Sequence, residues 1–168
     1  MMQVLRAIGF GLFLTLTACA SVASETSSVC LNLPEGDYCA YDETRDAVKD
    51  VEAAQTFAKE TDRKSLIVMG ANWCHDSRAL AGHFQTDRFK TLLEEHYSLV
   101  YVDVGEKNRN LDIARSFGLD GIVGTPTVII QKSDGTVMNL DTAVTWRNSA
   151  SRTSDTIYEE LERFALIE

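Results

Sequence analysis

The residues best suited to chemistry gather around Cys74. The apolar run over 65–70 predicts a buried strand before this cysteine, and 78–81 has a helical pattern after it. A cysteine at a strand-to-helix junction faces unpaired backbone N–H groups and the positive end of the helix dipole. Both features stabilise the thiolate, which is the nucleophilic form of cysteine. The segment therefore predicts a reactive thiol.

The neighbours of Cys74 can tune it. His75 would add to the stabilisation of a thiolate if it were protonated, whereas the negative charge of Asp76 opposes it. Ser77 lies one helical turn further on and can donate a hydrogen bond to the sulfur. Trp73 is the predicted substrate-binding residue, because its indole offers an apolar wall to a docked molecule. We predict catalytic roles for Cys74, His75 and Ser77.

The elements that must position these residues alternate along the chain. Helical spacing of apolar residues predicts helices over 45–60, 78–81, 87–96, 110–117 and 154–166. Runs of β-forming residues predict strands over 65–70, 97–104, 127–131 and 136–139, the last two joined in a hairpin by the turn 133–135. Thr44 is the expected N-cap of the first helix, and Trp146 is expected to pack at the surface. This order predicts an α/β domain with a mixed sheet.

A second motif supplies a resemblance to a known family. Gly124-Thr125-Pro126-Thr127 directly precedes a predicted strand, about fifty residues after Cys74. Together with the segment 73–77, this motif resembles the active site of the thioredoxin superfamily. In that family the site has the sequence Trp-Cys-x-x-Cys, and a loop with a cis-proline faces it. The resemblance covers roughly 45–168 and implies a thioredoxin-like fold, with a central mixed sheet flanked by helices. It also implies a cis Thr125–Pro126 bond and a substrate-binding role for both residues, with the Thr125 backbone pairing with an extended peptide.

The chain departs from that family at two positions. Ser77 stands where the second cysteine would be and cannot resolve a mixed disulfide. Val68, six residues before Cys74, replaces the buried acid that the family often has there. The resemblance therefore implies a single-cysteine thiol-disulfide oxidoreductase or isomerase, acting on disulfide-bearing proteins or small thiols. It needs no cofactor other than glutathione or another thiol as co-substrate. The alternative is a binding lipoprotein that has kept the fold and lost the redox activity.

The N-terminal segment predicts export. Arg6 precedes an apolar run of about ten residues, too short to span a membrane, and Leu16-Thr17-Ala18-Cys19 resembles the lipobox of bacterial lipoproteins. We expect a signal peptide over 1–18, a lipid on Cys19 and a tether over 19–29. Ala20 in place of Asp favours the outer membrane, facing the periplasm. A plain signal peptide cleaved later is the alternative.

Three cysteines then remain in an oxidising compartment. Cys30 and Cys39 enclose a short segment with Pro34 and Gly36, which are turn residues, so we expect a disulfide between them. It belongs to a short extension over 30–44 ahead of the domain at 45–168. The alternative is that one of the two resolves a disulfide on Cys74, since sequence alone does not fix connectivity.

Composition excludes other classes of function. The 168 residues carry a net charge of −9 and contain no basic run, which argues against nucleic acid as a partner, because such binding requires Lys and Arg to neutralise phosphates. The membrane is contacted through the lipid anchor alone. His75, His83 and His96 could be considered metal ligands together with Cys74, but no CxxC or HxxxH spacing supports a metal site.

Overall fold

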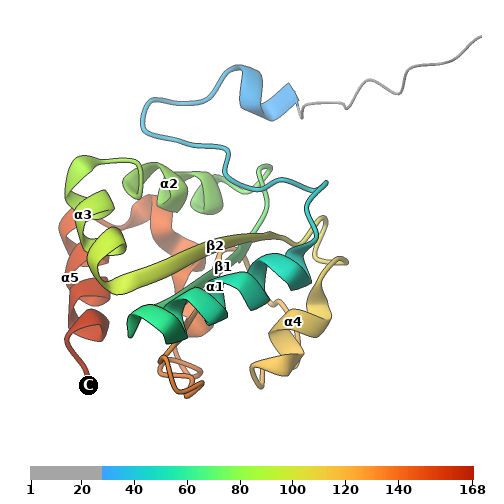
Figure 1. Ribbon diagram of the computed structural model, residues 1–168. Coiled ribbons are helices and arrows are strands. Elements are labelled where there is room, and N and C mark those ends of the chain that lie inside the picture. Colours follow the sequence, from blue (N-terminus) through green and yellow to red (C-terminus); the bar gives the residue numbers. More distant parts are fainter. Residues whose placement is uncertain (1–27) are drawn as a thin grey trace, which may run out of the picture.

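The computed structural model describes residues 28–168, so the expected signal peptide over 1–18, Cys19 and most of the tether lie outside the described residues. A short 3-10 helix η1 (Ser28–Leu31) comes first (Figure 1). The elements that follow it are α1 (Ala47–Thr61), β1 (Lys64–Gly70), α2 (His75–His83), α3 (Asp87–His96), β2 (Tyr97–Asp103), α4 (Leu111–Ser116), β3 (Thr127–Gln131), η2 (Ala143–Ser151) and α5 (Ser154–Ala165). None of these helices is both long enough and apolar enough to cross a membrane.

The sheet has three strands in the order β2-β1-β3. β1 pairs in parallel with β2, with Ile67 opposite Val100, and antiparallel with β3, with Ile67 opposite Ile129. β1 is therefore the central strand, which explains why it is an unbroken apolar run rather than an alternating one. The expected mixed sheet is confirmed.

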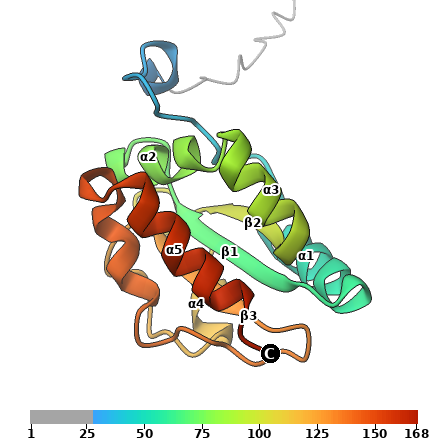
Figure 2. The ribbon, with the colours of Figure 1, turned by 90° about the vertical axis from the view of Figure 1, so that its left-hand side faces the viewer.

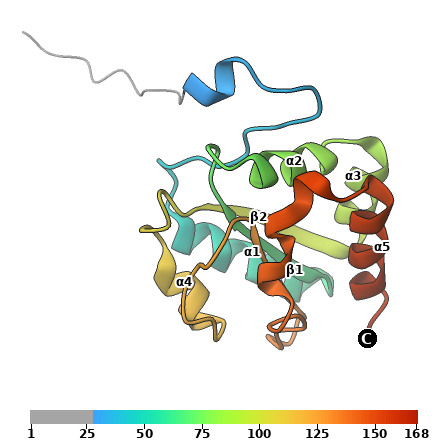
Figure 3. The same cartoon turned by 180° about the vertical axis from the view of Figure 1, so that it is seen from behind.

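Helices cover both faces of the sheet. Leu66 and Val68 of β1 face one core, which α2, α3, η2 and α5 complete, whereas Ile67 and Met69 face a second core under α1 and α4. Figure 2 shows α3 and α5 next to each other, with α1 beyond β1 and β2, and Figure 3 shows α5 and the segment before it from the opposite side. The alternation of side chains along β1 thus divides its apolar residues between two cores.

The first helix begins later than expected. Asp46, and not Thr44, is its N-cap, and the Asp46 side chain accepts a hydrogen bond from the backbone N–H of Lys49. Thr44 donates instead to Asp42 Oδ1, through both its backbone N–H and its hydroxyl, and so belongs to a turn before the helix. Both residue types cap helices well, and the local turn at Asp42 decides between them.

The expected strand over 136–139 does not form beyond a single bridge between Gln131 and Val137. The fully buried side chain of Asn139 takes its place beside β3. Its Oδ1 accepts from the Ile130 N–H and its Nδ2 donates to the Val128 carbonyl oxygen, each at 2.8 Å. One amide therefore satisfies two backbone groups that a neighbouring strand would otherwise pair.

Asn139→Ala is expected to lower the free energy of unfolding by about 2 to 4 kcal/mol, because it leaves a buried donor and a buried acceptor on β3 without partners. Urea denaturation of the two proteins measures this. Asn148→Ala, an exposed position with no such bonds, is the control and should change stability by less than about 0.5 kcal/mol. If Asn139→Ala lowers the free energy of unfolding no more than the control does, the Asn139 side chain does not take the place of a strand beside β3.

Trp146 is also not where the sequence suggested. The residue was expected at the surface, but it is fully buried within η2, in the core shared with α2 and α5. The error arises because η2 is an irregular helix with Asn148 outside helical geometry, so its apolar residues lack a recognisable period.

Candidate active site

Cys74 is the N-cap residue of α2 and follows β1 by a short turn. Its thiol donates to the carbonyl oxygen of Thr125 at 3.2 Å, and 9% of the residue is exposed. Cys74 is the only cysteine among residues 28–168 that is not in a disulfide. The expected strand-to-helix junction is confirmed, although the neutral thiol makes no capping hydrogen bond with the first backbone N–H groups of the helix.

The Thr125–Pro126 bond is cis, as the family resemblance implied. It places Thr125 against Cys74, although the two residues are 51 positions apart in sequence. Trp73 lies on the exposed side of this junction, with 40% of its surface accessible, and its indole N–H donates to the Gly105 carbonyl oxygen at 2.9 Å. The structure therefore brings Trp73, Cys74 and Thr125 together at one place on the surface.

His75 and Ser77 lie on opposite sides of this junction. The His75 side chain is 63% exposed, and its Nε2 is 4.0 Å from Asp37 Oδ1. Ser77 is fully buried, and its hydroxyl has no hydrogen-bond partner among the described residues. Asp76 accepts from the Ala150 N–H at 2.9 Å and so ties α2 to η2. His75 is thus available to solvent and substrates, whereas Ser77 faces the interior.

Arg78 fixes the residues that precede the cysteine, a role that the sequence did not reveal. Its side chain is 10% exposed, and its Nη1 donates to the carbonyl oxygens of Asn72 and Trp73 at 2.8 and 3.1 Å. Its Nε donates at 3.0 Å to Asp37, a carboxylate with a side chain only 5% exposed. A planar guanidinium can serve these three acceptors at once, which an ammonium group cannot do as well.

The loop ahead of α1 packs onto the active-site helix. Cys30 and Cys39 form a disulfide, as expected. Asn72 donates to the Tyr41 carbonyl oxygen at 2.6 Å and accepts from the Tyr41 N–H at 3.1 Å. Gly82 permits close approach, since a Cβ there would lie 1.6 Å from the Gly36 carbonyl oxygen. Figures 1 and 3 both show this loop running along α2.

Comparison with known proteins gives the family. The sequence profile described as thioredoxin-like matches residues 46–133, which is just over half of the chain and includes both motifs. The chain belongs to the thioredoxin-like family. A solved structure described as a disulphide isomerase from Xylella fastidiosa Temecula1 is 34% identical, with a TM-score of 0.68, and the match covers 80% of this chain and 98% of that one.

Two more distant structures share the thioredoxin-like fold. A thioredoxin from Thermus thermophilus is 18% identical over 68% of this chain and 83% of its own, with a TM-score of 0.51. The oxidised C-terminal domain of DsbD from Neisseria meningitidis is 20% identical over 70% of this chain and 95% of its own, also with a TM-score of 0.51. No curated protein matches the sequence.

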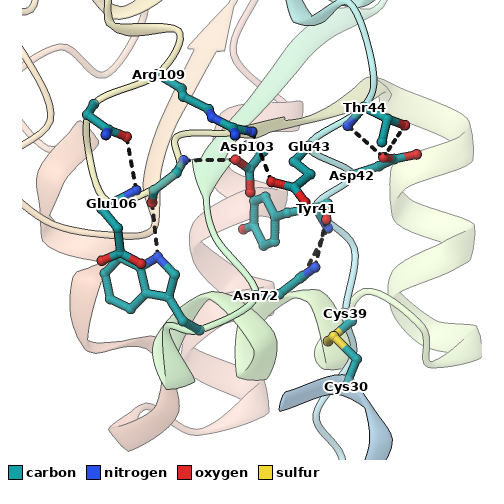
Figure 4. A pocket seen from close by; sticks show the side chains of 13 residues that line it. Cys30, Cys39, Tyr41, Asp42, Glu43, Thr44, Asn72, Asp103, Glu106 and Arg109 are labelled. Atoms are coloured by element: carbon teal, nitrogen blue, oxygen red, sulfur yellow. Dashed lines mark hydrogen bonds and ion pairs between the residues drawn. A yellow bond between two sulfur atoms is a disulfide. The ribbon is translucent and has the colours of Figure 1, made fainter. Parts of the chain in front are cut away.

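This thioredoxin-like chain has an acidic pocket of about 520 Å³ next to Trp73. Figure 4 shows Asp42, Glu43, Asp103 and Glu106 around it, together with the Cys30–Cys39 disulfide. Burial raises the pKa of Asp103, and Arg109 pairs with Glu43 at 3.0 Å. Cys74 does not line this pocket, and the pocket adjoins the thiol site through Tyr41, Asn72 and Trp73.

The histidines considered as metal ligands are dispersed. His83 packs on the ring of Phe89, and burial lowers its pKa. His96 lies beside Glu95 at the end of α3, far along the chain from Cys74. Between residues 28 and 168, no group of three or more His, Cys, Asp or Glu side chains is arranged to hold a metal ion.

Proposed function

We propose that the protein is a thiol-disulfide oxidoreductase or isomerase of the bacterial envelope that acts through the single nucleophile Cys74. The observation that carries this proposal is the free thiol at the start of α2, held against the cis Thr125–Pro126 loop and beside the exposed Trp73. The similarity to a structure described as a disulphide isomerase, at 34% identity, supports the same chemistry.

The chemistry can proceed without a second active-site cysteine. The Cys74 thiolate attacks one sulfur of a client disulfide, a new sulfur–sulfur bond forms, and the client's other sulfur leaves as a thiolate that takes up a proton. A thiolate of the client then attacks the client sulfur in this mixed disulfide, forms a different client disulfide and expels Cys74 as a thiolate. The client keeps the same number of disulfides, so isomerisation needs no net oxidant or reductant.

Substrate docking falls to residues around the thiol. Trp73 offers an apolar face, and the Thr125 backbone is available to pair with an extended peptide once the Cys74 thiol no longer donates to its carbonyl oxygen. Glutathione or another small thiol can serve as co-substrate when a client does not rearrange. Export, lipidation of Cys19 and location at the periplasmic face of the outer membrane are parts of the proposal that rest on the N-terminal sequence.

The deciding test is capture of mixed disulfides. Cells that produce the full chain are quenched with acid, thiols are blocked, and complexes are separated without reductant. We expect adducts that disappear on reduction and that are absent from Cys74→Ser. If the native protein and Cys74→Ser capture the same partners, the chain is instead a binding protein with a thioredoxin-like fold. The Cys74→Ser variant keeps the size and polarity of the side chain and so controls for folding.

A further inference from the structure

Three buried hydroxyls near the active site have no hydrogen-bond partner among residues 28–168: those of Tyr41, Ser77 and Tyr101. Two of them are neighbours. The Tyr41 hydroxyl and Ser77 Oγ each lie 2.6 Å from the position that a Cβ on Gly70 would occupy, so the missing side chain of Gly70 leaves room for both. Buried polar groups without partners are uncommon in proteins and often serve a function.

Tyr41 is held in place by two sets of contacts. Its backbone makes two hydrogen bonds with the Asn72 side chain, directly before the active-site residues. Its ring meets the ring of Tyr101 edge to face, with centroids 5.4 Å apart. Burial raises the pKa of Tyr41 well above its usual value, and Tyr101 adds to this. Tyr41 therefore remains a neutral O–H donor over the range of pH in which a thiol ionises.

Ser77 links Tyr41 to the sulfur. It occupies the third position of α2, three residues after the N-cap Cys74, and residues three apart on a helix are neighbours. The neutral thiol donates to the Thr125 carbonyl oxygen, but a thiolate has no proton to donate and needs donors instead. The Ser77 hydroxyl is unpaired and can rotate to meet that need.

We propose that Tyr41 is a positioning residue for the nucleophile: its hydroxyl donates to Ser77 Oγ and thereby directs the Ser77 hydroxyl at the Cys74 thiolate. This rests on the proposed function. The two hydroxyls are unpaired when Cys74 is neutral and become paired when it ionises, so the chain stabilises the thiolate selectively. The residue lies two positions after the Cys30–Cys39 disulfide, and it supplies a polar group beneath an active site in which Val68 replaces the family's acid.

Other charged groups around the thiol are unaffected by removal of this hydroxyl. His75 is exposed at the entrance, and Asp76 is bonded to the Ala150 N–H. Arg78 and Asp37 form their own pair on the loop side. Asp103, at the end of β2, also acts on Tyr41 and is the one acid that faces it from the neighbouring strand. Tyr41→Phe keeps all of these groups and the aromatic ring.

The test measures the rate at which Cys74 in the full chain reacts with iodoacetamide between pH 5 and 10. Tyr41→Phe is expected to react about 10-fold more slowly near neutral pH, with its profile displaced to higher pH, since a hydrogen bond to a charged group is lost. Ser77→Ala should slow the reaction at least as much. The double variant, which combines Tyr41→Phe with Ser77→Ala, should react at the same rate as Ser77→Ala. Tyr101→Phe, which removes the third unpaired hydroxyl, should behave like the native protein.

Two outcomes would overturn the proposal. One is a Tyr41→Phe profile that coincides with that of the native protein, and the other is a double variant slowed by the product of the two single effects, which would mean independent action. Failure of the proposed function looks different. The native protein would then capture no client disulfide, whereas the profiles of the native protein and Tyr41→Phe would still differ.

Discussion

Ser77→Cys is expected to turn the protein from a single-cysteine into a two-cysteine enzyme. Ser77 is fully buried one turn from Cys74, at the position of the second cysteine in the Trp-Cys-x-x-Cys site. The introduced thiol would attack any mixed disulfide on Cys74 from within the same molecule. Intramolecular attack by a well-placed group exceeds attack by a free thiol by many orders of magnitude in effective concentration. Captured client complexes should therefore fall by about 100-fold or more.

The same variant should also lose its free thiol after air oxidation. The native protein has one free cysteine among residues 28–168, and Ser77→Cys should have none until it is reduced, because the two sulfurs pair. Thiol titration and mass mapping measure this directly. Ser77→Ala is the matched control, since it removes the hydroxyl without adding a sulfur. A Ser77→Cys protein that still accumulates client complexes at the native level would show that Ser77 does not occupy the resolving position.

The sequence was sufficient to find the residues that stand beside strands. Cys74 and the Thr125–Pro126 loop were recognisable because each adjoins a run of β-forming residues, and a strand fixes where its neighbours lie. The bounds of α3 and β3 were also predicted correctly, because in both segments a strong pattern of residue types ends at a clear change. The candidate site was therefore largely visible as two motifs.

The supporting residues were not visible, because their partners are distant in sequence. Arg78 looked like one of several polar residues in a helix until Asp37 was found 41 positions away. Tyr41 gave no sign of reaching Ser77 and Gly70, and Asn139 carried no mark of a side chain that completes a sheet. Such roles depend on long-range packing, which residue types and spacing do not encode directly. Buried polar residues are the group for which local pattern is least informative.

Arg78→Met is expected to release the loop over 30–44 from the active-site helix. Methionine replaces the apolar stem of the arginine side chain but leaves the buried Asp37 carboxylate without its partner. Removal of one member of a buried ion pair typically costs about 3 to 5 kcal/mol, far more than the loss of an exposed pair. The Asn72 and Trp73 carbonyl oxygens also lose their donors. The segment before Cys74 should then move more freely.

Hydrogen exchange can detect the release locally. The Tyr38 N–H donates to the Arg78 carbonyl oxygen and the Tyr41 N–H to Asn72 Oδ1, so these two amides report on whether the loop is docked. In Arg78→Met both should exchange at least 100-fold faster, which corresponds to the low end of the expected cost at about 1.4 kcal/mol for each factor of ten. Amides in β1 report on global stability and separate the release of the loop from unfolding of the whole domain.

A second substitution separates charge from packing. Arg78→Met combined with Asp37→Asn leaves no unpaired buried charge, so it should recover part of the protection lost in Arg78→Met. Arg78→Lys keeps the charge but has no planar group that can donate to all three acceptors. The exchange rates of its Tyr38 and Tyr41 amides should therefore lie between those of the native protein and Arg78→Met. If Arg78→Met leaves the Tyr38 and Tyr41 amides as protected as in the native protein, the ion pair does not hold the loop. The docking would then depend on the Gly36–Gly82 contact, the Asn72 amide and the backbone hydrogen bond from Tyr38 to Arg78, because Arg78→Met keeps all three of these links between the loop and the segment that carries Cys74.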